Sequence, residues 1–303
     1  MSNPYLLLPD FLLIMLGFVV CRRTALDRPV WEAAEKLVYY LLFPVLLFGS
    51  IVKSPLQIGT AASLAAAGVG TTVIGIAVAL SIGRWPGVDR RLHASGAQIA
   101  YRFNSYVALA LSERLFGATG LAWMALLIAL SVPLCNVAAV WPLARHGGHS
   151  YLREIVRNPL LISTVLGLVA NAAGLVIPES LATVLQRIGS AALPLGLMAV
   201  GAGLAFGGLK AAPRLATALL GIRHALMPAV AIGLALAVHL APEQRSIVVL
   251  FGALPTSAAS YVLATRMGGD GGFVAGLVTV STMLGMVSVP LWLSALSALT
   301  GAG

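Results

Sequence analysis

The sequence predicts an all-α polytopic membrane protein: ten transmembrane helices as two inverted five-helix repeats, with a crossover of broken helices 4 and 9. Three observations predict this fold, namely the composition, a series of charge-poor runs and an ordered internal repeat. Of the 303 residues, 59% are hydrophobic and only 10% are charged. Soluble domains carry about 25% charged residues, so this chain has too few charges to cover a water-facing surface. Lipid is therefore the expected outer solvent.

Ten charge-poor runs follow one another, and most reach the roughly 20 residues needed to cross a hydrocarbon core. The expected spans are 5–21, 37–52, 58–83, 95–115, 118–144, 158–178, 188–209, 215–240, 246–265 and 272–299. The second run is short, and we expect its helix to begin earlier, near Glu32–Lys36. The first run lacks the basic start of a cleavable signal and is followed by Arg22 and Arg23, so we interpret it as a retained helix.

The net charge of +9 raises nucleic acid as a partner, but the placement of the basic residues excludes it. They lie in short gaps between apolar runs, as the positive-inside rule distributes them. Of the 19 Lys and Arg residues, 13 fall in odd-numbered loops, 4 in even-numbered loops, and Arg102 and Arg223 lie near or inside spans. We therefore expect a bacterial inner-membrane protein with cytoplasmic odd loops and both termini extracytoplasmic.

The two halves of the chain repeat each other at an offset that drifts only from 150 to 157 residues. The matching pairs are Pro9 with Pro159, Gly17 with Gly167, Pro44 with Pro194, 105–107 with 260–262, and 131–134 with 288–291. Each half holds five expected spans, an odd number, so the second copy must enter from the opposite side. The result is an inverted pair, 1–146 and 147–303, an architecture that recurs in secondary transporters.

Inverted repeats place a ligand near the midplane, where equivalent helices are broken. Polar residues and a helix breaker cluster at equivalent positions of the fourth and ninth spans. The candidate binding residues are Arg102, Asn104, Ser105 and Tyr106 in the fourth span and Pro255, Thr256, Ser257, Ser260 and Tyr261 in the ninth. Ends of broken helices present free N–H groups and partial positive charge. We therefore expect an anion, such as a carboxylate, at this place.

The sequence leaves two possible roles open for several other residues. Arg102 either pairs with an anionic ligand or extends to the cytoplasmic interface. Asp10 is either interfacial or a proton-coupling group. Pro44 and Pro194 either kink their helices or also shape the cavity.

Simpler roles are expected for the remaining candidates. Arg223 and His224 are expected at the interface, and Glu113 is expected to pair with Arg114 at the outer end of the fourth span. Cys21 and Cys135 lie in apolar runs and are interpreted as packing residues. No metal site and no cofactor are expected. Since no acidic pair stands in a span, a membrane enzyme is not expected either.

Four segments carry a resemblance to a known family. They are LVYYLLFPVLLFGSIVKS at 37–54, RNPLLISTVLGLVANAAGLVIPESL at 157–181, IGSAALPLGLMAVGAGL at 188–204 and PTSAASYVLATRMGGDGGFVAGLVTVSTMLGMVSVPLWL at 255–293. On these segments the chain resembles the auxin efflux carrier family of membrane transporters. One departure is Ala259, where family members often have Asn before Ser-Tyr.

The resemblance implies a scaffold domain of spans 1, 2, 6 and 7 and a transport domain of spans 3–5 and 8–10, which move against each other in an elevator-like cycle. It implies efflux or exchange of small organic anions, such as auxin-like carboxylic acids or dicarboxylates, and a homodimer. The alternative keeps the fold and couples it to sodium, as in transporters resembling the bile acid carriers. Gln98, Asn104 and the hydroxyls of the ninth span would then supply oxygen ligands.

Overall fold

The computed structural model describes residues 8–53, 58–143, 159–205 and 208–300, and within these ranges the chain is helical and contains no strand. Both chain termini and the predicted repeat boundary at 146/147 lie outside the described residues. The all-helical prediction is confirmed for the described part of the chain. Among the residues that the structure describes, six helices are long and apolar enough to cross a membrane: Arg28–Lys53, Ala61–Arg84, Arg90–Ala139, Glu179–Ala202, Pro213–Ala237 and Gly271–Thr300.

The first half contains helices that follow the predicted runs. In order, they are α1 (Leu8–Arg23), α2 (Arg28–Leu37), the π-turn η2 (Val38–Leu42), α3 (Phe43–Lys53), α4 (Ile58–Ser81), η3 (Ile82–Arg84), α5 (Arg90–Gly96), η4 (Ala97–Ala100) and α6 (Ser105–Leu143). The helix of the second run does begin earlier, at Arg28. Within α6, Gly117 takes φ 59° and ψ −150°, a conformation open to glycine. The helix is therefore bent where the sequence predicts a boundary between two spans.

The second half is interrupted at similar places. Its elements are α8 (Pro159–Ala172), α9 (Glu179–Ser190), α10 (Ala192–Ala202), η5 (Leu209–Ala211), α11 (Pro213–Gly221), the π-turn η6 (Ile222–Leu226), α12 (Met227–Ala237), α13 (Pro242–Ala253), α14 (Ala259–Arg266) and α15 (Gly271–Thr300). Pro242 and Pro213 begin their helices, where a proline's missing N–H costs nothing.

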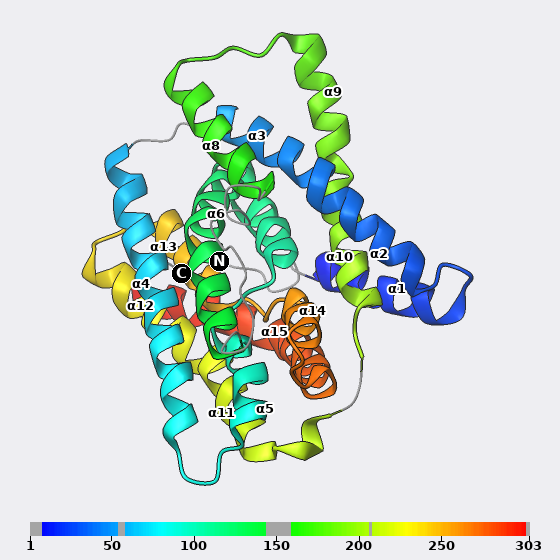
Figure 1. Cartoon of the computed structure of the whole chain (residues 1–303). Helices are drawn as coiled ribbons and strands as arrows, with labels where there is room; N and C mark the ends of the chain where they lie inside the picture. Colours follow the sequence, from blue (N-terminus) through cyan, green and yellow to red (C-terminus); the bar gives the residue numbers. More distant parts are fainter. Residues whose placement is uncertain (1–7, 54–57, 144–158, 206–207, 301–303) are drawn as a thin grey trace.

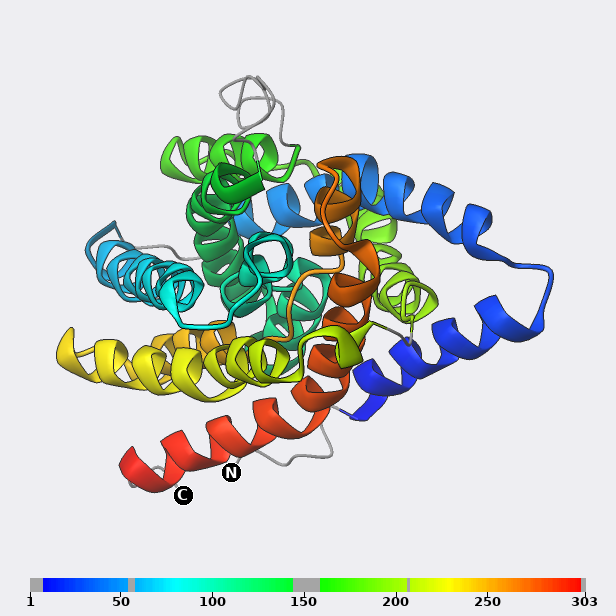
Figure 2. The same cartoon turned by 60° about the horizontal axis from the view of Figure 1, so that its bottom comes forward.

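Two groups of helices pack side by side. The first group is α1, α2, α3, α8, α9 and α10, and the second is α4, α5, α6 and α11 to α15. After rotation, the blue α1 and α2 lie at the right and the cyan α4 and yellow α12 at the left (Figure 2). Buried side chains of both groups join one hydrophobic cluster, with α3, α8 and α10 of the first group touching α6 of the second (Figure 1).

Glycines set the closest packing inside the first group. A Cβ on Gly17 of α1 would lie 1.9 Å from the carbonyl oxygen of Met198, and one on Gly201 of α10 would lie 1.7 Å from that of Ile14. The two backbones therefore touch, as in small-residue interfaces of membrane helices. Gly167 of α8 similarly faces Ile51 of α3, with its Cβ position 3.0 Å from the Ile51 side chain.

We predict that Gly201→Ala lowers the thermal midpoint of the detergent-purified protein, because the added methyl group overlaps the α1 backbone and would force the helices apart. Gly49→Ala is the matched control, since a Cβ there meets nothing within 4 Å. The measurement is a melting curve followed by size-exclusion chromatography. Equal midpoints for the two variants would contradict the prediction.

Candidate functional site

The fourth and ninth predicted spans are each interrupted in the middle. Residues 101–104 separate η4 from α6, and residues 254–258 separate α13 from α14. Pro255 accounts for the second interruption because proline lacks the N–H of a helical residue. Asn104 favours the first one, since its Oδ1 accepts hydrogen bonds from the N–H groups of Tyr106 (3.0 Å) and Val107 (3.3 Å). This is the geometry of a helix N-cap.

The two interruptions contact each other directly. The Asn104 N–H donates to the Pro255 carbonyl at 2.9 Å, and the Gln98 Nε2 donates to the Ser260 carbonyl at 3.2 Å. Arg102 donates from Nη1 to the Gln98 Oε1 at 3.2 Å. Backbone groups that leave their own helices therefore find partners across the crossing, as buried polar groups must.

A cavity of about 1130 Å³ opens beside the crossing. Six of the nine candidate binding residues line it: Arg102, Asn104, Ser105, Tyr106, Ser257 and Tyr261. The first residues of α6 and α14 are among the lining residues, so the N-terminal ends of two half-helices face the cavity. Arg102 is half-buried in this lining, which places it beside the predicted site.

The other three candidates do not belong to the lining. Pro255, Thr256 and Ser260 are buried, and Pro255 lies against Gly285 of α15, where an added Cβ would be 3.1 Å away. The Thr256 and Ser260 hydroxyls and the Asn104 Nδ2 are buried without a hydrogen-bond partner among the described residues. The crossing therefore keeps side-chain hydrogen-bonding groups that its own backbone does not satisfy.

Arg223 was missed as a site residue, and the expectation that it lies at the interface is wrong. Only 1% of it is exposed. Its Nη2 donates to the carbonyls of Phe251 (3.2 Å) and Gly252, at the C-terminal end of α13. Its Nη1 lies 3.5 Å from the Arg102 carbonyl. The guanidinium therefore neutralises the negative end of a broken helix.

His224 also lies inside the helix packing rather than at the interface. Its Nδ1 and Nε2 lie 2.9 Å and 2.8 Å from the hydroxyls of Ser288 and Ser281. The Ser281 hydroxyl also accepts the Thr256 N–H at 2.9 Å. The π-turn η6 contains both Arg223 and His224, and such turns are frequent at functional sites. The sequence did offer one signal for this site, since Arg223 is a charged residue inside an apolar run.

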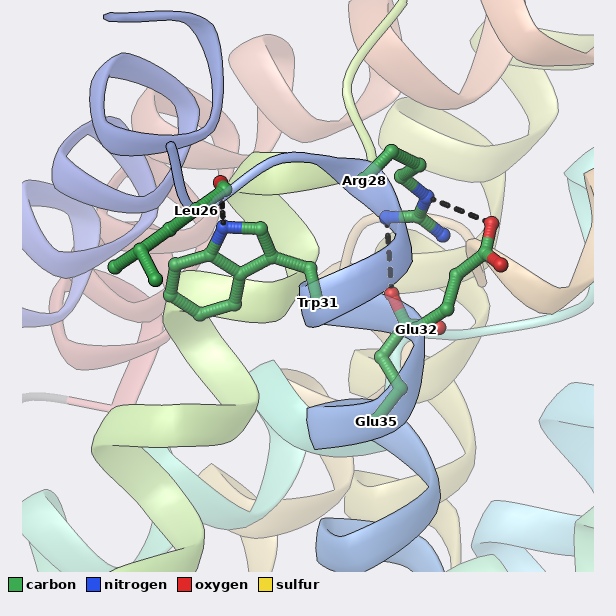
Figure 3. Close-up of polar contacts among 5 residues, drawn as sticks. All are labelled: Leu26, Arg28, Trp31, Glu32 and Glu35. Atoms are coloured by element: carbon green, nitrogen blue, oxygen red, sulfur yellow. Dashed lines mark hydrogen bonds and ion pairs between the residues drawn. The ribbon is translucent and has the colours of Figure 1, made fainter. Parts of the chain in front are cut away.

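The far side of the cavity carries charges that sequence analysis did not select. Arg22, Arg28, Glu32 and Glu35 line it. Figure 3 shows Arg28 between the two carboxylates, with Nε 3.3 Å from Glu32 and Nη1 3.1 Å from Glu35. Trp31 holds the same turn by donating its Nε1–H to the Leu26 carbonyl at 3.0 Å (Figure 3).

The expected local pair of Glu113 with Arg114 is replaced by a longer-range one. Arg114 of α6 makes a two-pronged ion pair with Asp10 of α1, with Nε on Oδ2 and Nη2 3.0 Å from Oδ1. Asp10 lies in the first turn of α1 and is 5% exposed. Its expected interfacial position stays a prediction, and its carboxylate is held by Arg114.

Pro44 and Pro194 lie at helix irregularities but outside the cavity lining. Pro44 follows the π-turn η2, and Pro194 is the third residue of α10, just after the α9–α10 break. A proline removes one N–H donor from the hydrogen bonds of a helix, so it is well tolerated next to such irregularities. Tyr39 and Val200, from the same two runs, do line the cavity. The cavity-shaping role of the prolines stays a prediction.

We predict that Arg223→Met destabilises the protein, because the carbonyls at the end of α13 lose a charged donor. Each charged hydrogen bond contributes about 1.5–3 kcal/mol, so the thermal midpoint should fall by roughly 5–10 °C. Arg214→Met, at an exposed position of α11, is the control and should melt near the wild type. A normal midpoint for Arg223→Met would contradict the capping role.

Comparison with known proteins identifies the family of the chain. The family model described as "Membrane transport protein" matches residues 142–293. The chain is 25% identical over 296 residues to a Rhizobium meliloti protein named "Putative malonate transporter", covering 94% of this chain and 92% of that protein. It is 31% identical over 146 residues to an "Uncharacterized transporter" of Methanothermobacter thermautotrophicus, covering 48% of each chain. The chain belongs to the auxin efflux carrier family of membrane transport proteins and is a transporter rather than an enzyme.

Proposed function

We propose that the protein is a secondary transporter, an efflux carrier or exchanger, for small organic anions such as auxin-like carboxylic acids or dicarboxylates. The observation that carries the proposal is the asymmetry of charge at the crossing. Two half-helix N-termini and the Arg102 side chain face the cavity, whereas Arg223 occupies the carbonyls at the end of α13. On the side of the crossing, the cavity therefore offers the Arg102 guanidinium and the positive ends of two helix dipoles, which suit a carboxylate. Glu32 and Glu35, which also line the cavity, are paired with Arg28.

The size of the cavity and one relative support the same substrate class. About 1130 Å³ exceeds the volume of a small organic acid and leaves room for water around it. The relative covering 94% of the chain is named for malonate, a dicarboxylate. The second carboxylate of such an anion would need another positive group, and Arg22 also lines the cavity.

Ten helices in inverted repeats account for the packing. The repeat pairs the first span with the sixth and the second with the seventh. Accordingly, the contact of α1 with α10 and that of α8 with α3 become equivalent contacts, and both are extensive. Gly17 and Gly167, 150 residues apart, lie at these two contacts. We take this as support for the inverted repeat.

The two helix groups support the proposal of alternating access. The first group corresponds to the proposed scaffold of spans 1, 2, 6 and 7, and the second to the proposed transport domain of spans 3–5 and 8–10. The cavity lies where the groups meet, with Arg28 and Tyr39 on one wall and Asn104 and Ser257 on the other. Movement of the second group along the first would carry an anion bound at the crossing, in an elevator-like cycle. The inner-membrane location, the extracytoplasmic termini and the homodimer remain expectations from the sequence.

Arg223 also bears on the coupling ion. In sodium-coupled transporters with broken helices, backbone carbonyls and C-terminal helix ends bind the cation. Here the guanidinium of Arg223 takes the carbonyls of Phe251 and Gly252. A fixed positive charge at this place opposes a second cation, so the sodium-coupled alternative is not favoured.

We predict that proteoliposomes containing the protein exchange labelled malonate, malate or indole-3-acetate against the same unlabelled acid. Arg102→Ala and Asn104→Ala should each lower the exchange rate about tenfold or more, since each removes a donor at the crossing. Arg187→Ala, at an exposed position of α9, is the control. Normal exchange by both crossing variants would show that the proposed site is wrong.

We also predict that this exchange proceeds at the same rate in sodium and in choline media. The reason is the charge of Arg223 at the helix end where sodium would bind. Initial rates at several sodium concentrations are the measurement. A rate that rises with sodium and saturates would favour the symporter instead.

A further inference from the structure

We propose that the ion pair between Asp10 and Arg114 is the latch that keeps the extracytoplasmic side of the cavity closed in this conformation. The proposal rests on alternating access, as proposed above, but not on any particular substrate. Asp10 and Arg114 are positioning residues in this view, since neither lines the cavity beside the crossing.

The pair joins the two helix groups. Asp10 belongs to α1 of the first group and Arg114 to α6 of the second, 104 residues apart in sequence. The other ion pairs among the described residues, those of Arg28 with Glu32 and Glu35, lie within α2. Asp10 to Arg114 is therefore the one ion pair between the groups in the described part of the chain. Its two-pronged form fixes both distance and orientation.

The pair and the cavity lie at opposite ends of α1 and of the first limb of α6, which runs from Ser105 to the bend at Gly117. Ser105 and Tyr106, at the start of α6, line the cavity, as do Cys21 and Arg22 at the end of α1. With a rise of 1.5 Å per residue, Arg114 lies about 14 Å along α6 from Ser105, and Asp10 lies about 16 Å along α1 from Cys21. The two helices thus run antiparallel, pinned together at one end and lining an open space at the other.

The charge bias of the loops assigns these ends to the two sides of the membrane. The cavity end carries Arg22 and Arg28, which belong to the basic first loop, and Gly271 and Gly272, which follow the ninth span. The first loop and the ninth loop are odd-numbered loops, which the positive-inside rule assigns to the cytoplasm. The Asp10 end is then extracytoplasmic. The conformation is accordingly open to the cytoplasm and closed to the outside.

Opening the other side requires the groups to separate at Asp10. Separation breaks the charge-assisted hydrogen bonds between Arg114 and Asp10. In this conformation Asp10 is only 5% exposed, so water screens the attraction little. The latch therefore stabilises the cytoplasm-open state relative to the outward-open state. Neutralising either partner removes this preference and should shift the population toward the outward-open state.

The test uses thiol labelling from a defined side of the membrane. The two native cysteines, Cys21 and Cys135, are replaced by serine, and Ser105→Cys supplies a reporter at the crossing. Right-side-out and inside-out vesicles are treated with a membrane-impermeant maleimide, and the labelling rate is followed by gel shift. The intact pair should give fast labelling from the cytoplasmic side and slow labelling from the outside.

Asp10→Asn and Arg114→Gln should each raise the outside rate roughly tenfold, in the range of ordinary conformational coupling, and lower the cytoplasmic rate. Glu113→Gln, which neutralises the adjacent acid, is the matched control and should change neither rate. Arg114→Lys keeps the charge but not the two-pronged geometry, so its rates should lie between those of the parent and of Arg114→Gln. Arg114 is the more exposed partner, so its variants remain informative if Asp10→Asn does not fold.

Two results would overturn the latch. One is fast labelling from the outside with the pair intact. The other is an unchanged outside rate, or equal increases from both sides, in the neutral variants, since equal increases report general loosening. Labelling needs no substrate, so a failure of anion exchange would count against the proposed function and leave this test valid.

Discussion

The structure depends on satisfying backbone groups where helices are broken inside a lipid-facing protein. Hydrocarbon offers no hydrogen-bond partner, so exposed N–H and C=O groups are tolerated only where protein or a wet cavity supplies one. At the crossing, the Asn104 N–H bonds the Pro255 carbonyl across the two interruptions. The Asn104 side chain caps α6, and Arg223 bonds the carbonyls that end α13. Each of these hydrogen bonds also helps to hold the helix ends that the others satisfy.

The carbonyl end and the amide ends of the broken helices have different surroundings. The carbonyl end of α13 is bound by a buried cation, whereas the amide ends of α6 and α14 face the cavity. The N-terminal end of a helix carries partial positive charge even when it is capped, and Arg102 adds a full positive charge beside the cavity. The proposed preference for anions would therefore follow from how the break is stabilised, before any substrate is considered. It also explains why a membrane-embedded arginine such as Arg223 is tolerable: its charge is distributed over backbone carbonyls.

The sequence allowed prediction of the features that depend on local chemistry. Pro255 marks one break, and the polar run around Asn104 marks the other, because proline and a capping asparagine act on their own helix. Features that depend on a partner far along the chain were missed. Arg223 was assigned to the interface, and its carbonyl partners, 28 and 29 residues away, could not be foreseen. Arg114 was assigned to its neighbour Glu113, although Asp10 lies 104 residues away. Charge and hydropathy show that such residues are costly, but not where their partners are.

The kinds of contact within and between the helix groups differ in a way that bears on motion. Inside the first group, α1 and α10 meet backbone to backbone at Gly17 and Gly201, so sliding either helix would make the chains collide. Between the groups, contacts are made by side chains, such as the stacked rings of Phe43 and Tyr106, whose centroids are 5.1 Å apart. Side chains can change rotamer and exchange partners, whereas apposed backbones cannot. The proposed movement would therefore take place at this boundary of side chains, which a single ion pair between the described residues of the two groups holds at one end.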